Sequence, residues 1–374
     1  MRYALIGAGR VSVNHIAAVK TFSEFEFVGI CDIIPLQIDI ALKKANYLDF
    51  VKSYSDYKQL IDEQRPELVA IATESGLHAE IGKYCLSRGC NVIIEKPMAM
   101  SIQDANSLIR CARKNNRVLS VCHQNRYNKS MQNIYEAIRN GRFGNISHMA
   151  AHVRWSRDKN YYDQAPWRGR WSSDGGCLMN QCIHNADLMC WLLGEIDEVF
   201  AYTANRQHDY IEGEDLGLAL VKARNGQYGI FEGTVNVFPH NLEETFYVFG
   251  EKGTAKADGT SVNRISEWKF ADSEPNEEAE VIRSCEEIPP NVYGFGHTRL
   301  YEDVISAIKT GTRPLIDGNE GKKALELILA IYKSKKTGLP VKLPLGNFSS
   351  LDMSGTFLEK ERDIHVPSIS GNRF

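Results

Sequence analysis

The sequence predicts an α/β protein, in which a doubly wound parallel-sheet domain precedes an α+β domain with a large open, mainly antiparallel sheet. Up to about residue 122, short apolar strands alternate with segments of helical period, which is the pattern of βαβ units. After Arg126 several strands instead follow one another directly. Asn225-Gly226 separates two of them, and because both residues tolerate positive φ, this dipeptide predicts a tight antiparallel hairpin.

The first domain is expected over residues 1–122. Its strands are short and apolar, as strands buried on both faces of a parallel sheet should be, and they read YALIG, FVGIC, LVAIA, NVIIE and VLSVC. Ligands of doubly wound sheets bind at the carboxyl ends of the strands. The residues that follow these runs are therefore the first candidates for a functional site.

The second domain is expected over residues 123–345, with a polar C-terminal tail over 346–374 that the sequence leaves unexplained. Helical patterns are expected at about 130–140, 176–193, 297–310 and 319–336. Alternating apolar and polar residues predict strands near 196–204, 215–223, 227–237 and 243–250. A long aromatic and basic stretch lies between the first two of these helices.

Composition excludes several classes of protein. The 374 residues exceed the size at which a single hydrophobic core usually stops growing, in agreement with two domains. The 44 basic and 47 acidic residues give a net charge of −3, so no nucleic-acid partner is expected. A mean hydropathy of −0.32, without a long apolar run or an export signal, predicts a cytoplasmic protein with no membrane span. Nine scattered cysteines without a CxxC pair indicate reduced thiols and no metal site.

A glycine-rich turn follows the first strand and opens a helix. Gly7 and Gly9 stand at the turn, Arg10 and Val11 continue it, and the third glycine of the GxGxxG pattern is replaced by Ser12. Backbone N–H groups at a helix N-terminus can bind a pyrophosphate there. The second strand ends at Asp32, where a carboxylate would accept hydrogen bonds from the adenine ribose and repel a 2′-phosphate. The pattern therefore predicts a dinucleotide site for NAD rather than NADP.

Glu95-Lys96-Pro97 follows the strand NVIIE at the same sheet edge. An ammonium group near a substrate hydroxyl can polarise it. Desolvation beside an oxidised nicotinamide would lower the lysine pKa toward the range of a usable base. Lys96 is therefore a candidate for the redox centre.

A second polar cluster is expected on the helix over about 177–193, where Asn180, His184 and Asp187 are spaced i, i+4 and i+7 and so share one face. A histidine with an ordinary pKa near ~6.5 suits accepting the proton that a hydroxyl loses on oxidation. Lys96 and His184 are alternative candidates for that base. Asn180 is an amide and cannot accept the proton, so it would orient the hydroxyl instead.

The basic and aromatic stretch suggests an anionic ligand. Five cations, Arg154, Arg157, Lys159, Arg168 and Arg170, are interleaved with Trp155, Tyr161, Tyr162, Trp167 and Trp171. Arginine forks bind carboxylates and phosphates, and aromatic rings stack on bases. A nucleotide sugar fits this composition better than an uncharged sugar does, although a solvated loop anchored by its rings remains an alternative.

Taken together, GAGRVS at the start, EKP, the segment SSDGGCLMNQCIHNADLMCWLLG (172–194) and AIYKSKKTGLPVKLP near the C-terminus resemble the Gfo/Idh/MocA oxidoreductase family over nearly the whole chain. The resemblance implies a Rossmann NAD-binding domain and marks Lys96 and His184 as catalytic. It implies substrate contacts for Asn180, Gln181, Arg154, Tyr161 and Arg168. Further cofactor contacts are implied for Thr73, Ser75, His78, Glu95, Asn125, Trp167 and Arg168. Two departures are Asn180, where many relatives have Asp, and Cys177, where they have a third glycine.

Within that family the segments 161–171, 175–187 and 241–254 look like bacterial UDP-N-acetyl-2-amino-2-deoxyglucuronate dehydrogenases. That branch implies oxidation of the sugar 3-hydroxyl for surface-polysaccharide biosynthesis, with NAD reoxidised in place by a 2-oxo acid, in a homodimer or homotetramer. Other sugar or inositol dehydrogenases, an NAD-dependent redox-neutral glycosidase and a non-enzymatic sensor are the alternatives. The exact sugar and the direction of the reaction stay open.

Overall fold

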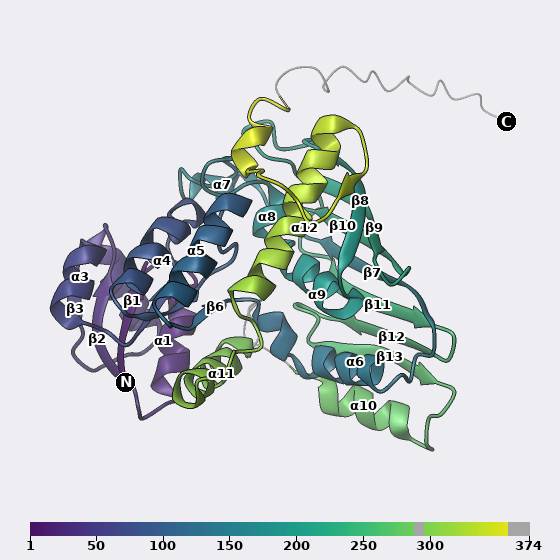
Figure 1. Ribbon diagram of the computed structural model, residues 1–374, viewed down its shortest axis with the longest axis horizontal. Coiled ribbons are helices and arrows are strands. Elements are labelled where there is room, and N and C mark those ends of the chain that lie inside the picture. Colours follow the sequence, from purple (N-terminus) through teal and green to yellow (C-terminus); the bar gives the residue numbers. More distant parts are fainter. Residues whose placement is uncertain (288–294, 358–374) are drawn as a thin grey trace.

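The predicted fold class is confirmed. The structure, a computed structural model, describes residues 1–287 and 295–357, and it contains two sheets that lie side by side (Figure 1). The first sheet has the strand order β3-β2-β1-β4-β5-β6, with all its pairs parallel. Its strands are β1 (Arg2–Ile6), β2 (Glu26–Cys31), β3 (Lys52–Tyr54), β4 (Leu68–Ile71), β5 (Asn91–Ile94) and β6 (Leu119–Val121).

Five helices alternate with these strands, as the period of the sequence predicts. They are α1 (Ser12–Lys20), α2 (Pro35–Lys44), α3 (Tyr57–Gln64), α4 (His78–Ser87) and α5 (Ile102–Lys114). Polar side chains fix where some of them begin. Ser101 accepts a hydrogen bond from the backbone N–H of Asp104 at the start of α5, and Asp56 does the same for Lys58 at the start of α3.

A sixth helix of the first domain comes from much later in the chain. Helix α11 (Gly296–Thr310) packs against α1, and the hydroxyl of its Tyr301 lies 2.9 Å from that of Tyr3 in the first strand. Both tyrosines are fully buried. The expected division at residue 122 therefore does not describe the first domain completely, because part of the segment 123–345 completes its core.

The second sheet has the order β13-β12-β11-β7-β10-β9-β8-β14. Its pairs are antiparallel except for β7 and β10, which are parallel. Its strands are β7 (Ile146–Arg154), β8 (Ile196–Ala204), β9 (Leu216–Ala223), β10 (Tyr228–Thr234), β11 (Glu243–Gly250), β12 (Gly253–Asp258), β13 (Arg264–Phe270) and β14 (Val341–Lys342). The Asn225-Gly226 hairpin joins β9 to β10 as predicted, with Gly226 at φ +88°.

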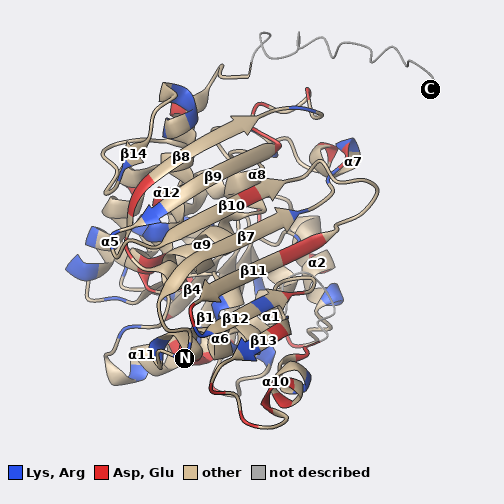
Figure 2. Ribbon diagram, turned by 90° about the vertical axis from the view of Figure 1, so that its right-hand side faces the viewer, with Lys and Arg blue, Asp and Glu red and all other residues tan. Residues whose placement is uncertain are grey.

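The described helices cover one face of this sheet. α9 (Ile183–Leu193) and α12 (Gly318–Thr337) pack against the inner face, while α6 (Lys129–Arg139) and α10 (Glu277–Cys285) lie toward its β13 edge (Figures 1 and 2). No helix of the described chain covers the other face, which Figure 2 shows toward the viewer. Large apolar side chains are exposed on its strands, namely Tyr202, Leu218, Leu220, Tyr228 and Ile230.

The first part of the tail packs on the chain itself. The hydroxyl of Ser350 donates to the carbonyl oxygen of Trp171 at 2.6 Å, and the ring of Phe357 stacks on that of Trp171. Residues 358–374 lie outside the described part of the chain. No helix among the described residues is long and apolar enough to span a membrane.

Candidate active site

The glycine turn has the geometry that a dinucleotide needs. Gly7 has φ +96°, and a Cβ there would lie 2.5 Å from the carbonyl carbon and oxygen of Ala72, so only glycine fits. Above Gly9 a Cβ would meet no atom within 4 Å, which leaves open space at the N-terminus of α1. The Ser12 hydroxyl donates to the Gly9 carbonyl at 2.5 Å. Ser12 therefore closes the turn, and the open N-terminus fits a pyrophosphate.

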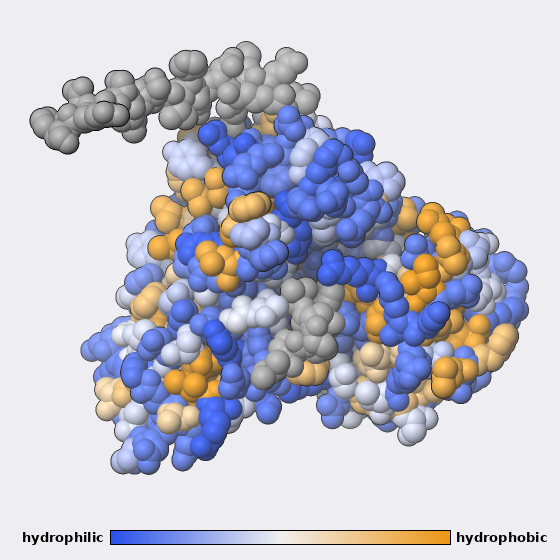
Figure 3. Space-filling view, turned by 180° about the vertical axis from the view of Figure 1, so that it is seen from behind, coloured by the Kyte–Doolittle hydropathy of each residue, from blue (hydrophilic) through white to orange (hydrophobic). Residues whose placement is uncertain are grey.

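Asp32 is fixed at the end of β2 by two backbone donors. Its carboxylate accepts from the N–H of Ala8 at 2.7 Å and from that of Ile34 at 2.8 Å. Five of the exposed large apolar side chains of this domain come next in the chain or lie in the loop before β3, namely Ile33, Ile34, Leu36, Leu48 and Phe50. Figure 3, seen from behind, shows orange surface gathered over the first domain. An acid bordered by apolar surface suits a ribose beside the flat face of an adenine.

Three predicted cofactor residues instead bond to the protein around the sheet edge. His78 is buried, with Nδ1 2.8 Å from the carbonyl oxygen of Pro97 and Nε2 3.1 Å from that of Thr73, so it braces two loops. The Thr73 hydroxyl donates to the Glu74 carbonyl. Asn125 donates its amide N–H to Glu244, whose pKa burial raises to about 8. These three residues shape the site through its loops.

Glu95 lies in a buried network that the sequence did not reveal. Its Oε1 is 3.2 Å from Nε2 of His15 and 3.3 Å from Nε2 of His297, and Nδ1 of His15 is 2.8 Å from the Tyr301 hydroxyl. Burial alone would raise the pKa of Glu95, but the hydrogen bonds to His15 and His297 hold it well below its usual range. Glu95 is therefore an ionised carboxylate next to Lys96. No sequence signal could link His297 to a residue some two hundred positions earlier.

Lys96 connects the two domains. Its Nζ donates to the main-chain oxygen of Asn180 at 2.7 Å. Burial lowers the pKa of Lys96, the carboxylates of Glu95 and Asp174 oppose that shift, and the nearby cations Arg168 and Arg157 add to it. An amine with a lowered pKa at this sheet edge can polarise a hydroxyl or accept its proton.

His184 is held as a neutral imidazole. Burial, followed by the positive charge of Lys96 and the neighbouring His123, lowers the pKa of His184 well below 6.5. The rings of His184 and His123 meet edge to face with centroids 5.7 Å apart. Within the described chain Nδ1 of His184 is buried without a hydrogen-bond partner, and the same holds for both ring nitrogens of His123. The lowered pKa makes this imidazole a weaker base than the ordinary value expected from the sequence, so His184 as the proton acceptor stays a prediction.

The helix expected to carry Asn180, His184 and Asp187 on one face is interrupted. The structure has a short α8 (Cys177–Asn180), a break at Gln181 and Cys182, and then α9. The break arises because Gln181 and Cys182 both donate their backbone N–H to the carbonyl of Cys177. The predicted polar stripe is therefore wrong as a regular helical face, and the break turns Gln181 so that its amide donates to the Tyr161 hydroxyl at 3.0 Å.

Asp187 does not face the cleft. It is fully buried, and both its oxygens accept from Arg126, at 2.7 Å each. The third nitrogen of that guanidinium donates to Glu320 on α12 at 2.9 Å. Arg126 follows β6 in the chain, so this ion pair joins the end of the first sheet to α9 and α12 of the second domain.

The basic stretch divides into paired and unpaired cations. Arg154 ends β7 and bonds to Glu232 and Glu243, Lys159 pairs with Asp163, and Arg170 pairs with Glu212. In the described part of the chain, Arg157 and Arg168 have no carboxylate partner. Their guanidinium carbons lie 5.0 and 4.1 Å from the ring centroid of Tyr161, and Arg168 also lies over Trp167. Among the described residues, two of the five predicted cations therefore lack a carboxylate partner, although Nη1 of Arg157 donates to the Ser156 carbonyl and to the Asn241 side chain.

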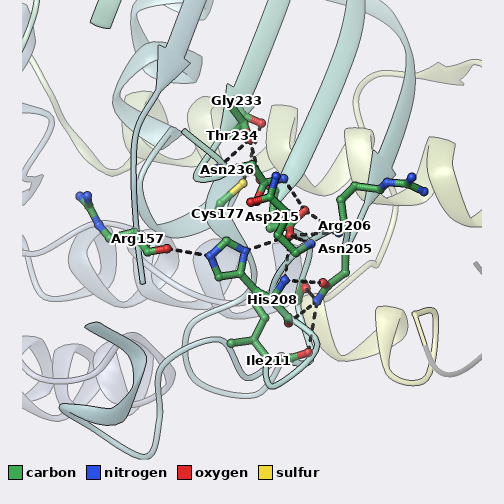
Figure 4. Close-up of polar contacts among 12 residues, drawn as sticks. Arg157, Cys177, Asn205, Arg206, His208, Ile211, Asp215, Gly233, Thr234 and Asn236 are labelled. Carbon is green, nitrogen blue, oxygen red and sulfur yellow. Dashed lines mark hydrogen bonds and ion pairs between the residues drawn. The ribbon is translucent and has the colours of Figure 1, made fainter. Parts of the chain in front are cut away.

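A buried histidine and aspartate hold the backbone of this stretch (Figure 4). His208 places Nε2 2.7 Å from the carbonyl oxygen of Arg157 and Nδ1 3.0 Å from Asp215. Asp215 also accepts from the backbone N–H groups of residues 206–208 and from the amide of Asn236. Burial opposes the charge on His208, but the bonds to Asp215 and Arg157 outweigh it and raise the pKa above 6.5.

Comparison with known proteins agrees with this architecture. Residues 1–123 match a family described as "Oxidoreductase family, NAD-binding Rossmann fold", and residues 131–256 match the "GFO/IDH/MocA C-terminal domain". The myo-inositol 2-dehydrogenase of Thermotoga maritima is 23% identical over 349 residues, which is 92% of this chain and 98% of that protein.

Two solved structures are more similar. The WlbA dehydrogenase of Bordetella pertussis, in complex with NADH and UDP-GlcNAcA, is 37% identical with a TM-score of 0.85, over 92% of this chain and 98% of that chain. The WlbA dehydrogenase of Chromobacterium violaceum, with the same two ligands, is 36% identical with a TM-score of 0.83, over 92% and 96%. With the glycine turn, Asp32 and Lys96 on one sheet edge, the chain belongs to the Gfo/Idh/MocA family of NAD-dependent oxidoreductases.

Proposed function

We propose that this protein oxidises the 3-hydroxyl of a UDP-linked N-acetylamino sugar uronate, with NAD as the hydride acceptor. The observation that carries the substrate class is the pair Arg157 and Arg168, which lack carboxylate partners within the described chain and whose charges act on Lys96. Two unpaired guanidinium groups beside the candidate redox centre favour a substrate that carries carboxylate or phosphate. The two WlbA structures hold such a nucleotide sugar.

Residues of the first domain would bind the cofactor. The backbone at Gly7 and Gly9 would hold the pyrophosphate, and Asp32 would accept the hydroxyls of the adenine ribose. When bound, NAD supplies an acceptor for the hydride that leaves the sugar carbon. The ionised Glu95 balances the positive charge that collects at this edge.

The substrate end uses groups from both domains. With Lys96 as an ammonium, its Nζ polarises the substrate hydroxyl and the hydroxyl proton passes to the neutral imidazole of His184 as the carbon is oxidised. In the alternative, Lys96 is a neutral amine when the substrate binds and its Nζ accepts that proton. Nδ1 of His184 is buried, so the accepting nitrogen on that ring is Nε2. Arg157 and Arg168 bind the anionic groups, and the rings of Tyr161 and Trp167 offer faces for the sugar or the base.

A substrate panel tests the proposal. NADH formation is expected with UDP-N-acetylglucosaminuronate, and weaker turnover with the uncharged UDP-N-acetylglucosamine. Arg168→Gln should raise KM for the uronate by about 10- to 100-fold, in line with the loss of one charge-assisted contact. The matched control Arg170→Gln removes a cation that is already paired with Glu212, and it should change KM little. Turnover of free sugars or inositol, with none of the nucleotide sugar, would contradict the proposal.

We also propose that the uncovered face of the second sheet pairs with another copy of the chain, in a homodimer or homotetramer. Exposed apolar side chains on β8, β9 and β10 support this, because monomers rarely expose such a patch. Light scattering on the purified protein checks it. Leu220→Glu, in the middle of the patch, should lower the measured mass to that of a smaller assembly or a monomer.

A further inference from the structure

Asp174 is a buried carboxylate that the sequence did not single out and that the mechanism above does not use. It lies three residues after Trp171, at the end of the basic and aromatic stretch, and is only 2% exposed. One of its oxygens accepts from the backbone N–H of Gly169 at 2.6 Å, and the other accepts from the side-chain amide of Asn180. It thus bonds to the turn that follows Arg168 and also to the end of α8.

The contact with Asp174 sets the orientation of the Asn180 amide. An ionised carboxylate only accepts hydrogen bonds, so the NH2 end of the amide must face it and Oδ1 must point away. The main-chain oxygen of the same residue accepts from Nζ of Lys96. Asn180 is therefore held at two points, with its amide oxygen left as the free acceptor of the side chain.

The charge of Asp174 also acts on Lys96. Lys96 and Arg168 are the cations that face Asp174, and the hydroxyl groups of Tyr161 and Tyr162 are the other titratable groups near it. Asp174 and Glu95 raise the pKa of Lys96 against the effect of burial. In return, burial raises the pKa of Asp174 to about 6, with the bonds to Gly169 and Asn180 opposing that shift.

We infer that Asp174 is a positioning residue for the oxidation: it points the Asn180 amide oxygen at the substrate hydroxyl and supplies a negative charge that acts on Lys96. This inference rests on the proposed function for its substrate. An amide oxygen accepts a hydrogen bond from an alcohol but makes none with a ketone, so this contact favours binding of the hydroxyl form over the oxidised sugar.

Asp174→Asn removes both effects with little change of shape. An amide at 174 can donate to Asn180, which lets the Asn180 amide turn over and present NH2 to the substrate. We expect KM for the alcohol substrate to rise by about tenfold or more and kcat to fall by about 10- to 100-fold, because a misplaced contact in the site has effects of this size. Asp163→Asn is the matched control, since Asp163 is exposed and pairs only with Lys159.

A second readout needs no substrate. Without the carboxylate the pKa of Lys96 should fall further, so its labelling by an amine-selective reagent near neutral pH, followed by mass spectrometry, should be faster than in the wild-type protein. If the wild-type protein oxidises no nucleotide sugar, the proposed function fails while the labelling still tests Asp174. If Asp174→Asn matches Asp163→Asn in labelling and turnover, the inference is overturned.

Asn180→Ala covers the case in which Asp174→Asn fails to fold, judged by circular dichroism and by NADH fluorescence. It leaves Asp174 and the main-chain acceptor of Lys96 in place. Lys96 labelling should then stay within about threefold of wild type while KM rises by about tenfold, since one hydrogen bond to the substrate is lost. The inference would be overturned if Asn180→Ala left KM unchanged. It would also be overturned if Lys96 in Asn180→Ala were labelled as fast as is expected for Asp174→Asn.

Discussion

The two walls of the active site are built in different ways. In the first domain the cofactor edge is mostly backbone: Gly7 fits under a carbonyl group, Gly9 leaves open space, and Asp32 is fixed by two backbone N–H groups. In the second domain the substrate wall is mostly side chains that hold one another, as with Asp174 and Asn180. The first wall depends on local chain geometry, whereas the second depends on contacts between distant segments. Mutations should therefore affect the two walls differently.

The largest expected effect concerns Lys96, which lies between the cofactor side and the substrate side of the site. Its substitution should lower kcat without weakening NADH binding. Lys96→Ala should lower kcat by roughly 10²- to 10⁴-fold, the usual contribution of a general acid or base. NADH affinity should stay within a few-fold, because the turn at Gly7 and the carboxylate of Asp32 remain. Stopped-flow absorbance and NADH fluorescence measure the two quantities. A fully active variant would exclude Lys96 from the chemistry, and Lys83→Ala on the surface of α4 serves as control.

Substitutions of the two glycines of the turn should have different effects: one should lower stability, and the other should weaken NADH binding. Gly7→Ala places a methyl group against the Ala72 carbonyl at positive φ, so the free energy of unfolding should fall by about 3 kcal/mol. Gly9→Ala meets no neighbour, so stability should change by less than about 0.5 kcal/mol. Its methyl group would instead enter the space of the pyrophosphate and weaken NADH binding. Denaturant unfolding with NADH titration checks both, and a stable Gly7→Ala protein would refute the packing argument.

In the second domain, Glu214 should make the free energy of unfolding depend on pH. Glu214 accepts from the backbone of Leu178 in α8 and from the Tyr332 hydroxyl, and burial raises its pKa to about 8. A raised pKa in the folded state means that the stabilising contribution is complete below about 4.5 and is lost as pH rises through about 8. Glu214→Gln should therefore raise the free energy of unfolding by up to about 3 kcal/mol at pH 7 and by nothing near pH 4. A difference that does not vary with pH would contradict this assignment.

The smallest expected effect concerns the contact shown in Figure 4. The pKa of His208 is raised, so its contribution is complete below about 6.5 and is lost as pH rises through its folded-state pKa. His208→Gln should destabilise by about 1 kcal/mol at pH 6, and by less at pH 9. KM for the nucleotide sugar should rise with it, because the Arg157 backbone is released. Thermal melts over this pH range measure the first effect, and equal losses at both pH values would exclude a charged His208.

The difference between local backbone geometry and contacts of distant segments also explains which site residues could be predicted from the sequence. Gly7, Gly9 and Asn225-Gly226 could be recognised because each acts through its own backbone. Asp32 could be recognised because its carboxylate is held by the backbone N–H groups of the turn and of the segment that follows it. Arg154 was predicted to bind substrate, but it lies at the end of a strand beside Glu232 and Glu243, which only the pairing of β7 with β10 and β11 brings close. Asp174 and His15 gave no signal, since their partners are set by tertiary packing.

The return of α11 to the first domain also bears on how such proteins can be recombined. The buried contacts of Tyr301 with Tyr3 and His15 depend on a helix encoded after nearly all of the second domain. A cofactor domain exchanged between relatives as one continuous piece, up to residue 122, would arrive without the helix that completes its core. Exchange should succeed when the donor supplies two separate pieces, residues 1–122 together with α11. The cofactor domain of this chain is therefore encoded in two segments, and only one of them contains the glycine turn.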